Sequence, residues 1–501
     1  MSPLTLIFLI PLLTAIVLLF VPARMERAVR GMTQAATGIS LLLALGVFTQ
    51  FQPGQGYQFV EQHDWMPSLG IGYHVGVNGI NIGLILMGAL VAFAAACSTR
   101  EIIQRVKEYH ILLLLMTGGI LGAFVSLDIF MMYFLHELAL VPTFIMIGVW
   151  GHGEDKNFAA FKITLYLSAG ALLALAGLIL LYTQIGANSF DLLVLLDHAS
   201  EHNPGLNIPM QNTIFGLLLF GLGILVSLWP FHTWAPLGYS AAPTAAAMMH
   251  AGVIKKFGLY VLLTVALPLL PDGATGWAWV LALLALGNLL WCGLVALKQK
   301  DFTLLLGNSS VAHMGFVFLG IASLNLIGIT GAVLVMIAHG LLAGLAFGLA
   351  GWIRQHTGST EMEKLGGLLQ TMPFVGGALL MALMAGCGLP GFANFAGEIA
   401  VFFGVWQSDF KIIAVVAAWA ALVIGAVYML RAARNLLHGP LPAIELGGED
   451  ARCCARLPFV LLLIALLLFG LCPHLLTNKI TPAAKTLLPP ANRAVQSAHN
   501  Q

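Results

Sequence analysis

The stretch WPFHTWAPLGYSAAPTAAAMMHAGVIKK runs from Trp229 to Lys256 and lies between two apolar segments. It opens with a Trp-Pro pair and closes with two lysines, Lys255 and Lys256. A lysine inside a bilayer costs roughly 2.5–3.5 kcal/mol on insertion scales and usually has a function. Interrupted backbone at membrane depth is tolerated only where protein or a watery cavity satisfies its polar groups. We therefore interpret this stretch as the centre of an ion pathway.

Composition places the whole chain in a lipid bilayer. Of its 501 residues, 59% are hydrophobic and 9% are charged, and the mean hydropathy is +0.93. A soluble domain is about 25% charged, and a transmembrane helix needs about 20 mostly apolar residues. The sequence therefore predicts an all-α polytopic membrane protein with about 14 transmembrane helices. The predicted segments are 3–21, 30–50, 78–97, 110–126, 128–150, 158–184, 213–235, 241–269, 277–297, 302–323, 326–353, 374–404, 411–436 and 457–477.

Several classes of protein are excluded by what the sequence lacks. The net charge of +1 provides no basic face for nucleic acid, and no GxGxxG or Walker loop provides a nucleotide site. The six cysteines are scattered, and the adjacent pair Cys453 and Cys454 fits neither a zinc site nor an iron–sulfur cluster. We therefore expect no metal site. The first apolar segment is not followed by a cleavage site, so we expect a retained helix.

The lysines and arginines gather in alternate loops and predict the orientation. Fifteen of the 22 lie on one side of the predicted helices, whereas the opposite loops hold only Lys411 at a helix edge. The positive-inside rule assigns the fifteen to the cytoplasm. Both termini then lie outside a bacterial-type inner (cytoplasmic) membrane. In the external loop 51–77, the glycine-punctuated run GIGYHVGVNG, residues 70–79, predicts a short β-hairpin.

Ionisable residues inside the apolar segments form the candidate site. Glu137 follows His136 near the middle of the fifth segment, where a carboxylate must be partnered, solvated or protonated. Lys162 lies one turn inside the sixth segment and either snorkels to the surface or pairs with Glu137. His232 stands between the two prolines that interrupt the seventh segment.

The pattern leaves open which lysine of the doublet faces the pathway. Lys255 and Lys256 are about 100° apart around a helix, so at most one is expected to face the interior squarely. His250 precedes Lys256 by six residues and shares its face poorly. His313 and His339 follow in later segments. Central histidines in successive helices favour a proton relay over isolated core groups.

A second interrupted helix mirrors the first. Segment 374–404 carries GLPG at its centre, and Glu398 follows in the second half-helix. Paired interrupted helices indicate inverted repeats around a midplane ion site. The sequence thus predicts two inverted five-helix repeats, helices 4–8 and 9–13, each with a broken helix. The predicted regions are 1–109 with the external hairpin, 110–269 for the first repeat, 277–436 for the second repeat, and 457–501 for the last helix and a tail. After residue 477 we expect this tail to be a polar surface arm.

Taken in order, the motifs around these residues resemble the antiporter-like subunits of respiratory complex I. The motifs are HELALVP, PFHTWAPLGYSAAPT, HAGVIKKFGLY, NSSVAHMGFVFLGI, MIAHGL and LPGFANFAGE, and the resemblance covers about residues 70–440. The lack of a long C-terminal lateral helix favours the branch called subunit M, or chain 4. Relatives of the same family occur in multi-subunit sodium/proton antiporters and membrane-bound hydrogenases.

The resemblance implies a role for each matching residue. Such subunits carry protons through two half-channels that are joined by a central row of charged groups. The matches are Glu137 to the acidic residue of the fifth helix, Lys162 to a lysine of the sixth, Lys256 to the central lysine of the eighth, His313 and His339 to the histidines of the tenth and eleventh, and Glu398 to the acidic residue on the exit side.

One departure from the family pattern concerns the first half of the chain. The family usually has a lysine on the seventh helix that pairs with the acidic residue of the fifth, but Leu225 stands at that position. Lys162, Lys255 or His136 could substitute as the partner of Glu137. Alternatively, the protonation of Glu137 is controlled differently.

The predicted function is proton translocation by a membrane-arm subunit of an NADH:quinone oxidoreductase. Redox chemistry in partner subunits drives it, so we expect NADH, FMN, iron–sulfur clusters and quinone there and no cofactor on this chain. The expected partners are the other membrane-arm subunits and the lipid bilayer. One alternative is a subunit of a sodium/proton antiporter or membrane-bound hydrogenase. Another is a scaffold with a vestigial channel. The sequence leaves the ion, the stoichiometry and the direction open.

Overall fold

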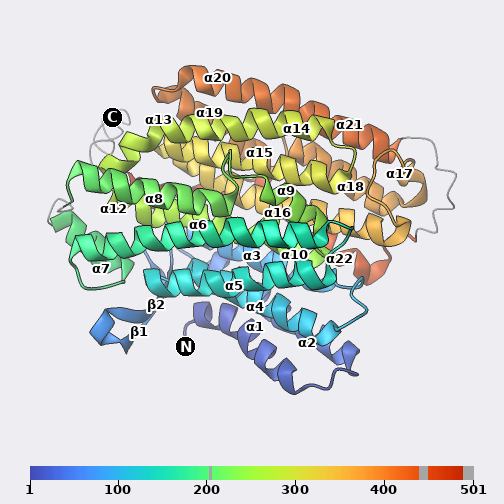
Figure 1. Cartoon of the computed structure of the whole chain (residues 1–501), viewed down its shortest axis with the longest axis horizontal. Coiled ribbons are helices and arrows are strands. Elements are labelled where there is room, and N and C mark those ends of the chain that lie inside the picture. The colour runs from blue at the N-terminus through green and yellow to red at the C-terminus, as the bar shows by residue number, and fades with distance from the viewer. Residues whose placement is uncertain (202–205, 439–448, 489–501) are drawn as a thin grey trace.

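The protein folds into an elongated bundle of helices. The computed structural model describes residues 1–201, 206–438 and 449–488, and Figure 1 shows most helices side by side along the long axis. Within these residues, eleven helices are long and apolar enough to cross a membrane, or twelve if one bent pair forms a single span. The polytopic all-α class is confirmed. The number of fourteen helices and the inverted relation of the repeats stay predictions.

The N-terminal part consists of two long helices, a hairpin and a shorter apolar helix. Its elements are α1 (Pro3–Phe20), α2 (Glu26–Gln50), β1 (Gln58–Met66), β2 (Ile71–Val77) and α3 (Asn81–Cys97). The two strands pair antiparallel, as expected for a hairpin. The prediction for residues 70–79 is only half right, because this run supplies the second strand alone. The chain reverses at Gly70, whose φ of +69° suits glycine, so the first strand lies upstream.

The remaining helices follow in chain order. Those before the doublet are α4 (Val106–Val125), α5 (Ile129–Trp150), α6 (Lys156–Ile185), α7 (Leu192–Glu201), α8 (Ile208–Val226) and α9 (Trp234–Ala241). One long helix, Thr244–Leu269, comprises α10 (Thr244–Met249), α11 (Lys256–Val261) and α12 (Leu267–Leu269), joined by π-helical turns. Those after it are α13 (Pro271–Gly287), α14 (Gly293–Lys298), α15 (Phe302–Ala322), α16 (Leu326–Thr357), α17 (Leu368–Thr371), α18 (Pro373–Gly386), α19 (Ala393–Gln407), α20 (Lys411–Trp419), α21 (Ala426–Leu437), α22 (Leu457–Leu471) and α23 (His474–Leu487).

The first predicted interruption is present, but the helix ends earlier than segment 213–235 suggests. α8 stops at Val226 because Ser227 adopts a left-handed conformation with φ +73°. The side chain of Asn288 forms hydrogen bonds with backbone groups in this break. Its Oδ1 accepts from the Trp229 N–H at 2.6 Å, and its Nδ2 donates to the Ser227 carbonyl at 3.1 Å. Protein groups therefore satisfy the broken backbone, as its depth in the membrane requires.

The second predicted interruption lies where GLPG placed it. α18 ends at Gly386 and α19 begins at Ala393. Gly388 has φ +68°, and a Cβ on it would lie 2.5 Å from Oε2 of Glu398. Only glycine fits here, because the turn needs a positive φ and passes directly over the carboxylate.

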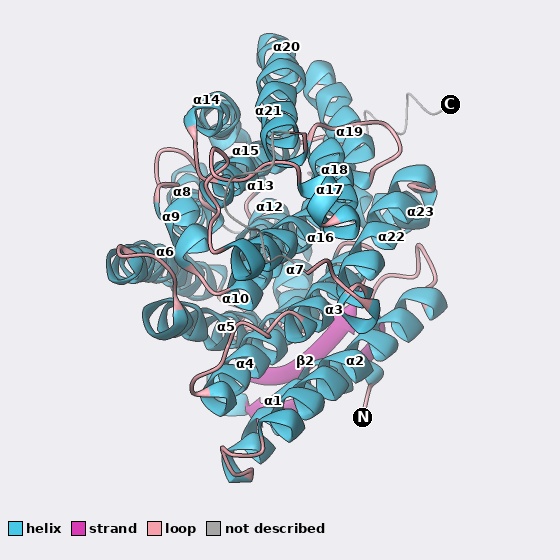
Figure 2. Ribbon diagram, turned by 90° about the vertical axis from the view of Figure 1, so that its right-hand side faces the viewer, coloured by secondary structure: helices cyan, strands magenta, loops and turns pink. Residues whose placement is uncertain are grey.

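Three spans form the interior of the bundle. In the apolar stretches of Thr244–Leu269 and α15, 94% of the residues are buried, and in α16 all of them are. The end-on view in Figure 2 places α16 and α12 centrally, with α1, α6 and α20 at the periphery. A helix that protein surrounds on every side buries its polar residues whichever way they point. Polar side chains of these spans must therefore find partners inside the protein.

The C-terminal helix packs back on the N-terminal part. The sequence predicted a polar surface arm after residue 477, but α23 continues to Leu487. Nζ of Lys479 lies 4.8 Å from the ring centre of Phe48 and donates to the Phe51 carbonyl at 3.1 Å. This cation–π contact and the hydrogen bond anchor α23, so the expectation was wrong for this part of the tail. Residues 489–501 of the predicted tail lie outside the described residues.

Candidate functional site

Lys256 is completely buried on α11 and contacts a histidine of α16. Its Nζ lies 2.8 Å from Nδ1 of His339 and donates to the carbonyl of Ala251 at 2.7 Å. Ala251 belongs to the π-helical turn His250–Ile254. Such turns shift the backbone hydrogen bonds by one residue and occur frequently at functional sites. The turn thus supplies a carbonyl to the amine, and the amine faces the imidazole.

The contact continues through a second histidine to a carboxylate. The ring centres of His339 and His313 are 5.5 Å apart, and Nε2 of His313 lies 3.7 Å from Oε1 of Glu398. Nδ1 of His313 lies 2.8 Å from the carbonyl of Ser309. A carbonyl only accepts, so Nδ1 carries the hydrogen and Nε2 faces the carboxylate. We call Lys256, His339, His313 and Glu398 the buried row.

Two small cavities adjoin the buried row, one on each side of His313. Ser309, Ser310, His313 and His339 line the first, with apolar side chains around them. The second borders His313, Glu398 and Tyr428, where Tyr428 donates from its hydroxyl to Oγ of Ser309 at 3.2 Å. Each has a volume of about 20 Å³, enough to admit a water molecule. Water can therefore bridge the longer gaps of the row.

Both lysines of the doublet are buried, which corrects the expectation that at most one faces the interior. Lys255 is 1% exposed, and its Nζ donates to Oγ of Ser310 at 2.9 Å. The two side chains do diverge around the helix, as the 100° offset requires. They nevertheless both meet protein, because α15 lies on one side of this helix and α16 on another.

The surroundings of Glu137 differ from those of the buried row. Its side chain is 30% exposed, and Oε1 lies 3.4 Å from Nδ1 of His136 without a hydrogen bond. The His136 ring stacks on Phe257, with ring centres 3.9 Å apart. Phe257 directly follows Lys256, so this stacking brings His136 of α5 against the residue next to the doublet.

Lys162 does not pair with Glu137. Its Nζ lies 6.0 Å from the ring centre of Phe158, one turn earlier on α6. Lys162 forms no ion pair with Glu137, whose carboxylate lies beside His136. The pairing alternative for Lys162 is therefore not realised. His232 lies in the break after α8 and is 6% exposed, with Nδ1 unpartnered. The structure brings neither side chain into the buried row.

No hydrogen bond connects His250 to the buried row. Both of its ring nitrogens lack a hydrogen-bond partner although the side chain is 1% exposed. The ring packs edge-on against Trp234 at 5.5 Å and near Tyr239 at 5.6 Å. It therefore lies beside the break between α8 and α9, in agreement with its poor alignment with Lys256.

Sequence reasoning missed three polar residues that adjoin the buried row. Ser309 and Ser310 precede His313 by one helical turn, and this spacing within NSSVAHMG could have identified them. Tyr428 comes from the last long span, and no sequence signal connects it with α15. Its proximity is a result of tertiary packing.

A second polar cluster lies at the opposite end from the hairpin, which we call the basic end. Oε2 of Glu101 lies 3.5 Å from Arg354 of α16 and 3.6 Å from His152, and Oε1 accepts from the N–H of Thr244. Burial alone would raise the pKa of Glu101, but His152, Arg354 and the Thr244 N–H together hold it below its usual value. The cluster thus caps the long helix that carries the lysine doublet.

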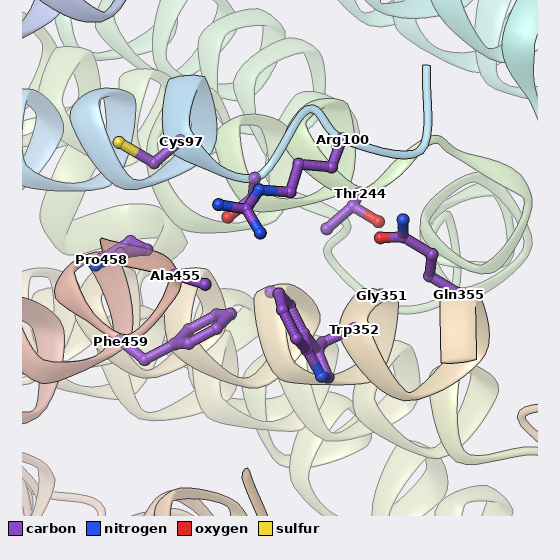
Figure 3. A pocket seen from close by; sticks show the side chains of 11 residues that line it. Cys97, Arg100, Thr244, Gly351, Trp352, Gln355, Ala455, Pro458 and Phe459 are labelled. Atoms are coloured by element: carbon purple, nitrogen blue, oxygen red, sulfur yellow. The ribbon is translucent and has the colours of Figure 1, made fainter. Parts of the chain in front are cut away.

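A pocket of about 20 Å³ adjoins this cluster at the basic end. Figure 3 shows Arg100, Thr244 and Gln355 on one side of it and the rings of Trp352 and Phe459 on the other. None of the four residues of the buried row lines it. In the part of the chain that the structure describes, no group of three or more His, Cys, Asp or Glu residues could hold a metal ion.

Comparison with known proteins gives consistent results. Residues 126–425 match the sequence model of the family described as "NADH:quinone oxidoreductase/Mrp antiporter, TM". "NADH-quinone oxidoreductase subunit M" of Rickettsia bellii is 30% identical over 459 residues, which is 91% of each chain. The protein of that name from Rhodobacter capsulatus is 32% identical over 497 residues, 97% of this chain and 96% of the other.

Solved structures agree in fold. A chain of "Respiratory complex I from Thermus thermophilus with bound NADH" superposes with a TM-score of 0.86 at 27% identity, covering 97% of this chain and 100% of that one. A chain of the Mrp complex from Dietzia sp. gives a TM-score of 0.83 at 22% identity, covering 99% and 98%. The second likeness concerns the fold alone.

Proposed function

The chain belongs to the NADH:quinone oxidoreductase/Mrp antiporter transmembrane family, and from this premise we propose that it is a membrane subunit of an NADH:quinone oxidoreductase that carries protons across the bilayer. Relatives along almost the full length of the chain are named subunit M of that complex. The other membrane-arm subunits and the lipid bilayer are then its partners. The protein lies in the inner membrane of a bacterium as a multi-pass subunit.

The buried row is the observation that carries the proposal. An amine, two imidazoles and a carboxylate follow one another from the long helix Thr244–Leu269 through α16 and α15 to α19, and each of these groups can gain and lose a proton. Nζ of Lys256 gives a proton to Nδ1 of His339, and the other ring nitrogen of His339 releases its proton to water in the cavity. That water gives a proton to Nε2 of His313, and Glu398 then accepts a proton from Nε2. Groups this close titrate together, so the charge on one sets the proton occupancy of the next.

Glu137 is the proposed entrance to the first half. Its carboxylate is partly exposed and adjoins His136, whose ring stacks against the residue after Lys256. A proton taken up by Glu137 reaches the doublet through His136 and water, and His250 is the next titratable group beside this route. Lys162 on α6 and His232 in the break after α8 lie outside this route. Their role is to set the charge near that break.

No redox step is assigned to this chain. We assign NADH, FMN, the iron–sulfur clusters and quinone to partner subunits, because the residues here supply proton carriers and no nucleotide motif. The chain then takes part in the oxidoreductase as the subunit that uses the free energy of electron transfer. Electron transfer in the partner subunits is coupled to proton transfer in this chain through changes in the charge of the buried row.

We propose that both termini lie on the external side of the membrane. Ser2 donates from its backbone N–H to Glu61 of the hairpin at 2.7 Å, and α23 packs on Phe51 before the hairpin. Both ends of the described chain therefore lie away from the basic end. The positive-inside rule then assigns the basic end to the cytoplasm.

The test is Lys256→Ala in the assembled complex in membrane vesicles. We expect proton pumping to fall at least about tenfold, since a positioned proton carrier typically contributes that much or more. Thr264→Val is the matched control on the same helix, because the Thr264 hydroxyl donates to the Tyr260 carbonyl one turn earlier and contacts none of the four residues of the buried row. Quinone reduction and pumping at parental levels in Lys256→Ala would overturn the role of the lysine.

A sodium/proton antiporter subunit is the second candidate, because the matching family includes Mrp antiporters and a chain of the Mrp complex shares the fold. The polypeptides that co-purify with the chain separate the two. Flavin and iron–sulfur clusters in the purified complex support the oxidoreductase, and a complex without them supports the antiporter. Glu137→Gln and Glu398→Gln that are both silent in pumping would support a scaffold instead.

A further inference from the structure

Lys255 has its own surroundings, distinct from those of the buried row. Its amine is fully enclosed, donates to Oγ of Ser310 at 2.9 Å and lies 3.3 Å from the Ser310 carbonyl. The Tyr239 ring centre lies 5.5 Å from Nζ, which gives the ammonium a π face as well. Every one of these partners is uncharged. A lysine that served only as a structural cation would need a carboxylate for comparable stabilisation.

The partner of Lys255 opens on the same cavity as the histidines. Ser310 lines the cavity of about 20 Å³ that also borders His313 and His339. A serine hydroxyl donates one hydrogen and accepts others, so Ser310 can take a proton from the amine while it releases its own into the cavity. Lys255 therefore has a path into the buried row that does not pass through Lys256.

The two amines of the doublet affect each other. Lys255 and Lys256 are adjacent in sequence and both lie in the protein interior, where ammonium charges are screened much less than in water. A proton on one amine therefore opposes a proton on the other. Two sites so coupled load in turn rather than together.

We propose that Lys255 is a second proton-carrying site of the pathway, which loads alternately with Lys256 and delivers its proton through Ser310 to the cavity beside His313 and His339. The inference rests on the proposed function and adds a branch to it. In the transfer, an N–H bond of the ammonium breaks and an O–H bond forms on Ser310. The original Ser310 proton leaves to water in the cavity, so the serine ends neutral and no electron is moved.

The test compares three substitutions of Lys255 in the assembled complex. Leucine removes the amine, arginine keeps a permanent charge and donors, and histidine keeps the ability to gain and lose a proton. We expect Lys255→Leu and Lys255→Arg to reduce proton pumping at least fivefold and Lys255→His to recover part of it. A purely structural cation would instead be rescued by arginine, and that result would overturn the proposal.

Ser310 provides the second arm of the experiment. Ser310→Ala removes the hydroxyl and leaves the carbonyl bond to Lys255, so we expect pumping to fall two- to fivefold. Ser310→Thr restores a hydroxyl and should return pumping towards the parental rate. Parental pumping in Ser310→Ala would exclude this route, and Thr264→Val controls for the loss of a buried hydroxyl in the same region.

Assembly on native gels and the rate of quinone reduction separate the inference from the proposed function. If Lys256→Ala abolishes pumping and Lys255→Leu does not, the second site is wrong and the proposed function holds. If pumping survives Lys256→Ala at the parental rate, the proposed function itself fails. If both variants lose pumping while the complex assembles, and Lys255→Arg does not restore it, both statements are supported.

Discussion

The two intramembrane carboxylates of this protein have opposite surroundings. Glu398 is 7% exposed, lies 3.7 Å from His313 and is covered by the turn at Gly388. Glu137 is 30% exposed at the side chain and has one oxygen without a hydrogen-bond partner. The first ends a continuous row of titratable groups, whereas the second adjoins only Tyr133 and His136 of its own helix among the described residues.

This difference follows from what each carboxylate faces. Glu398 points from α19 to His313 of α15, a span in which 94% of the apolar stretch is buried, whereas Glu137 lies beside His136 of its own helix α5, in which half of the apolar stretch is buried. A carboxylate inside the bundle must be partnered by protein, whereas one at the surface of the chain at membrane depth faces lipid or a neighbouring subunit. The comparison predicts unequal consequences when the two halves are altered.

The largest effect is expected at the middle of the buried row. His339→Leu removes the only ring that contacts both Lys256 and His313 among the described residues. Proton pumping in vesicles should fall by about tenfold or more, because no other side chain bridges these groups. His356→Leu is the control on the same helix, since His356 binds the Trp352 carbonyl at the basic end. Unchanged pumping in His339→Leu would mean that the row is not the route.

The two carboxylates themselves give the direct comparison. Glu398→Gln should reduce pumping by about tenfold, whereas Glu137→Gln should reduce it by only about two- to threefold, because Glu137 lies outside the contacts of the buried row. Both variants are measured by pumping per molecule of assembled complex. Equal losses would show that Glu137 is as firmly connected as Glu398, which would contradict the difference between the two halves.

The cluster at the basic end connects the two predicted repeats, because Glu101 contacts both Thr244 of the first and Arg354 of the second. Glu101→Ala should lower the free energy of unfolding by about 3 kcal/mol, since breaking a buried ion pair leaves Arg354 uncompensated. The N-terminus of the long helix at Thr244 also loses its acceptor. Thermal unfolding of the purified protein in detergent measures this. Glu363→Ala, at an exposed ion pair with Lys300, is the control and should change stability by less than about 1 kcal/mol.

The smallest effect is expected at the hairpin. The Thr5 hydroxyl and the Ser2 N–H hold the pKa of Glu61 at about 2, below its ordinary value of 4.5. The ionised Glu61 carboxylate therefore stabilises the folded protein fully above pH 4.5, and this contribution is lost as the pH falls from 4.5 towards 2. Glu61→Gln should remove this pH dependence from thermal unfolding. Pumping at neutral pH should stay at the parental rate, and a large loss would mean that the hairpin acts on the pathway.

Sequence reasoning found the row because membrane sequences restrict ionisable residues so strongly. The lysine doublet, His313, His339 and Glu398 were all identified before any distance was known, since charge and imidazole inside apolar segments are costly. The family resemblance alone selected Lys256 from the doublet. The GLPG break was placed correctly for a similar reason. The neighbours Ser309, Ser310 and Tyr428 were missed, because hydroxyls are inexpensive in a membrane helix and carry little signal.

Pairing between helices could not be read from the pattern. Lys162 and Glu137 are plausible partners by type and depth, yet Nζ of Lys162 lies near Phe158 on its own helix. The lysine doublet is the clearest case. Helical geometry fixes the angle between Lys255 and Lys256, but it does not show that protein covers both directions.

The sequence by itself determined that this is a polytopic membrane protein, where its helices break, and which ionisable residues lie inside its apolar segments. Those features depend on local composition and on the cost of polar groups in a bilayer. Tertiary structure alone decided the order of contact, in which Lys256 meets His339 across helices and Lys255 meets Ser310. That order depends on which helices surround the doublet, and long-range packing sets it rather than any local pattern.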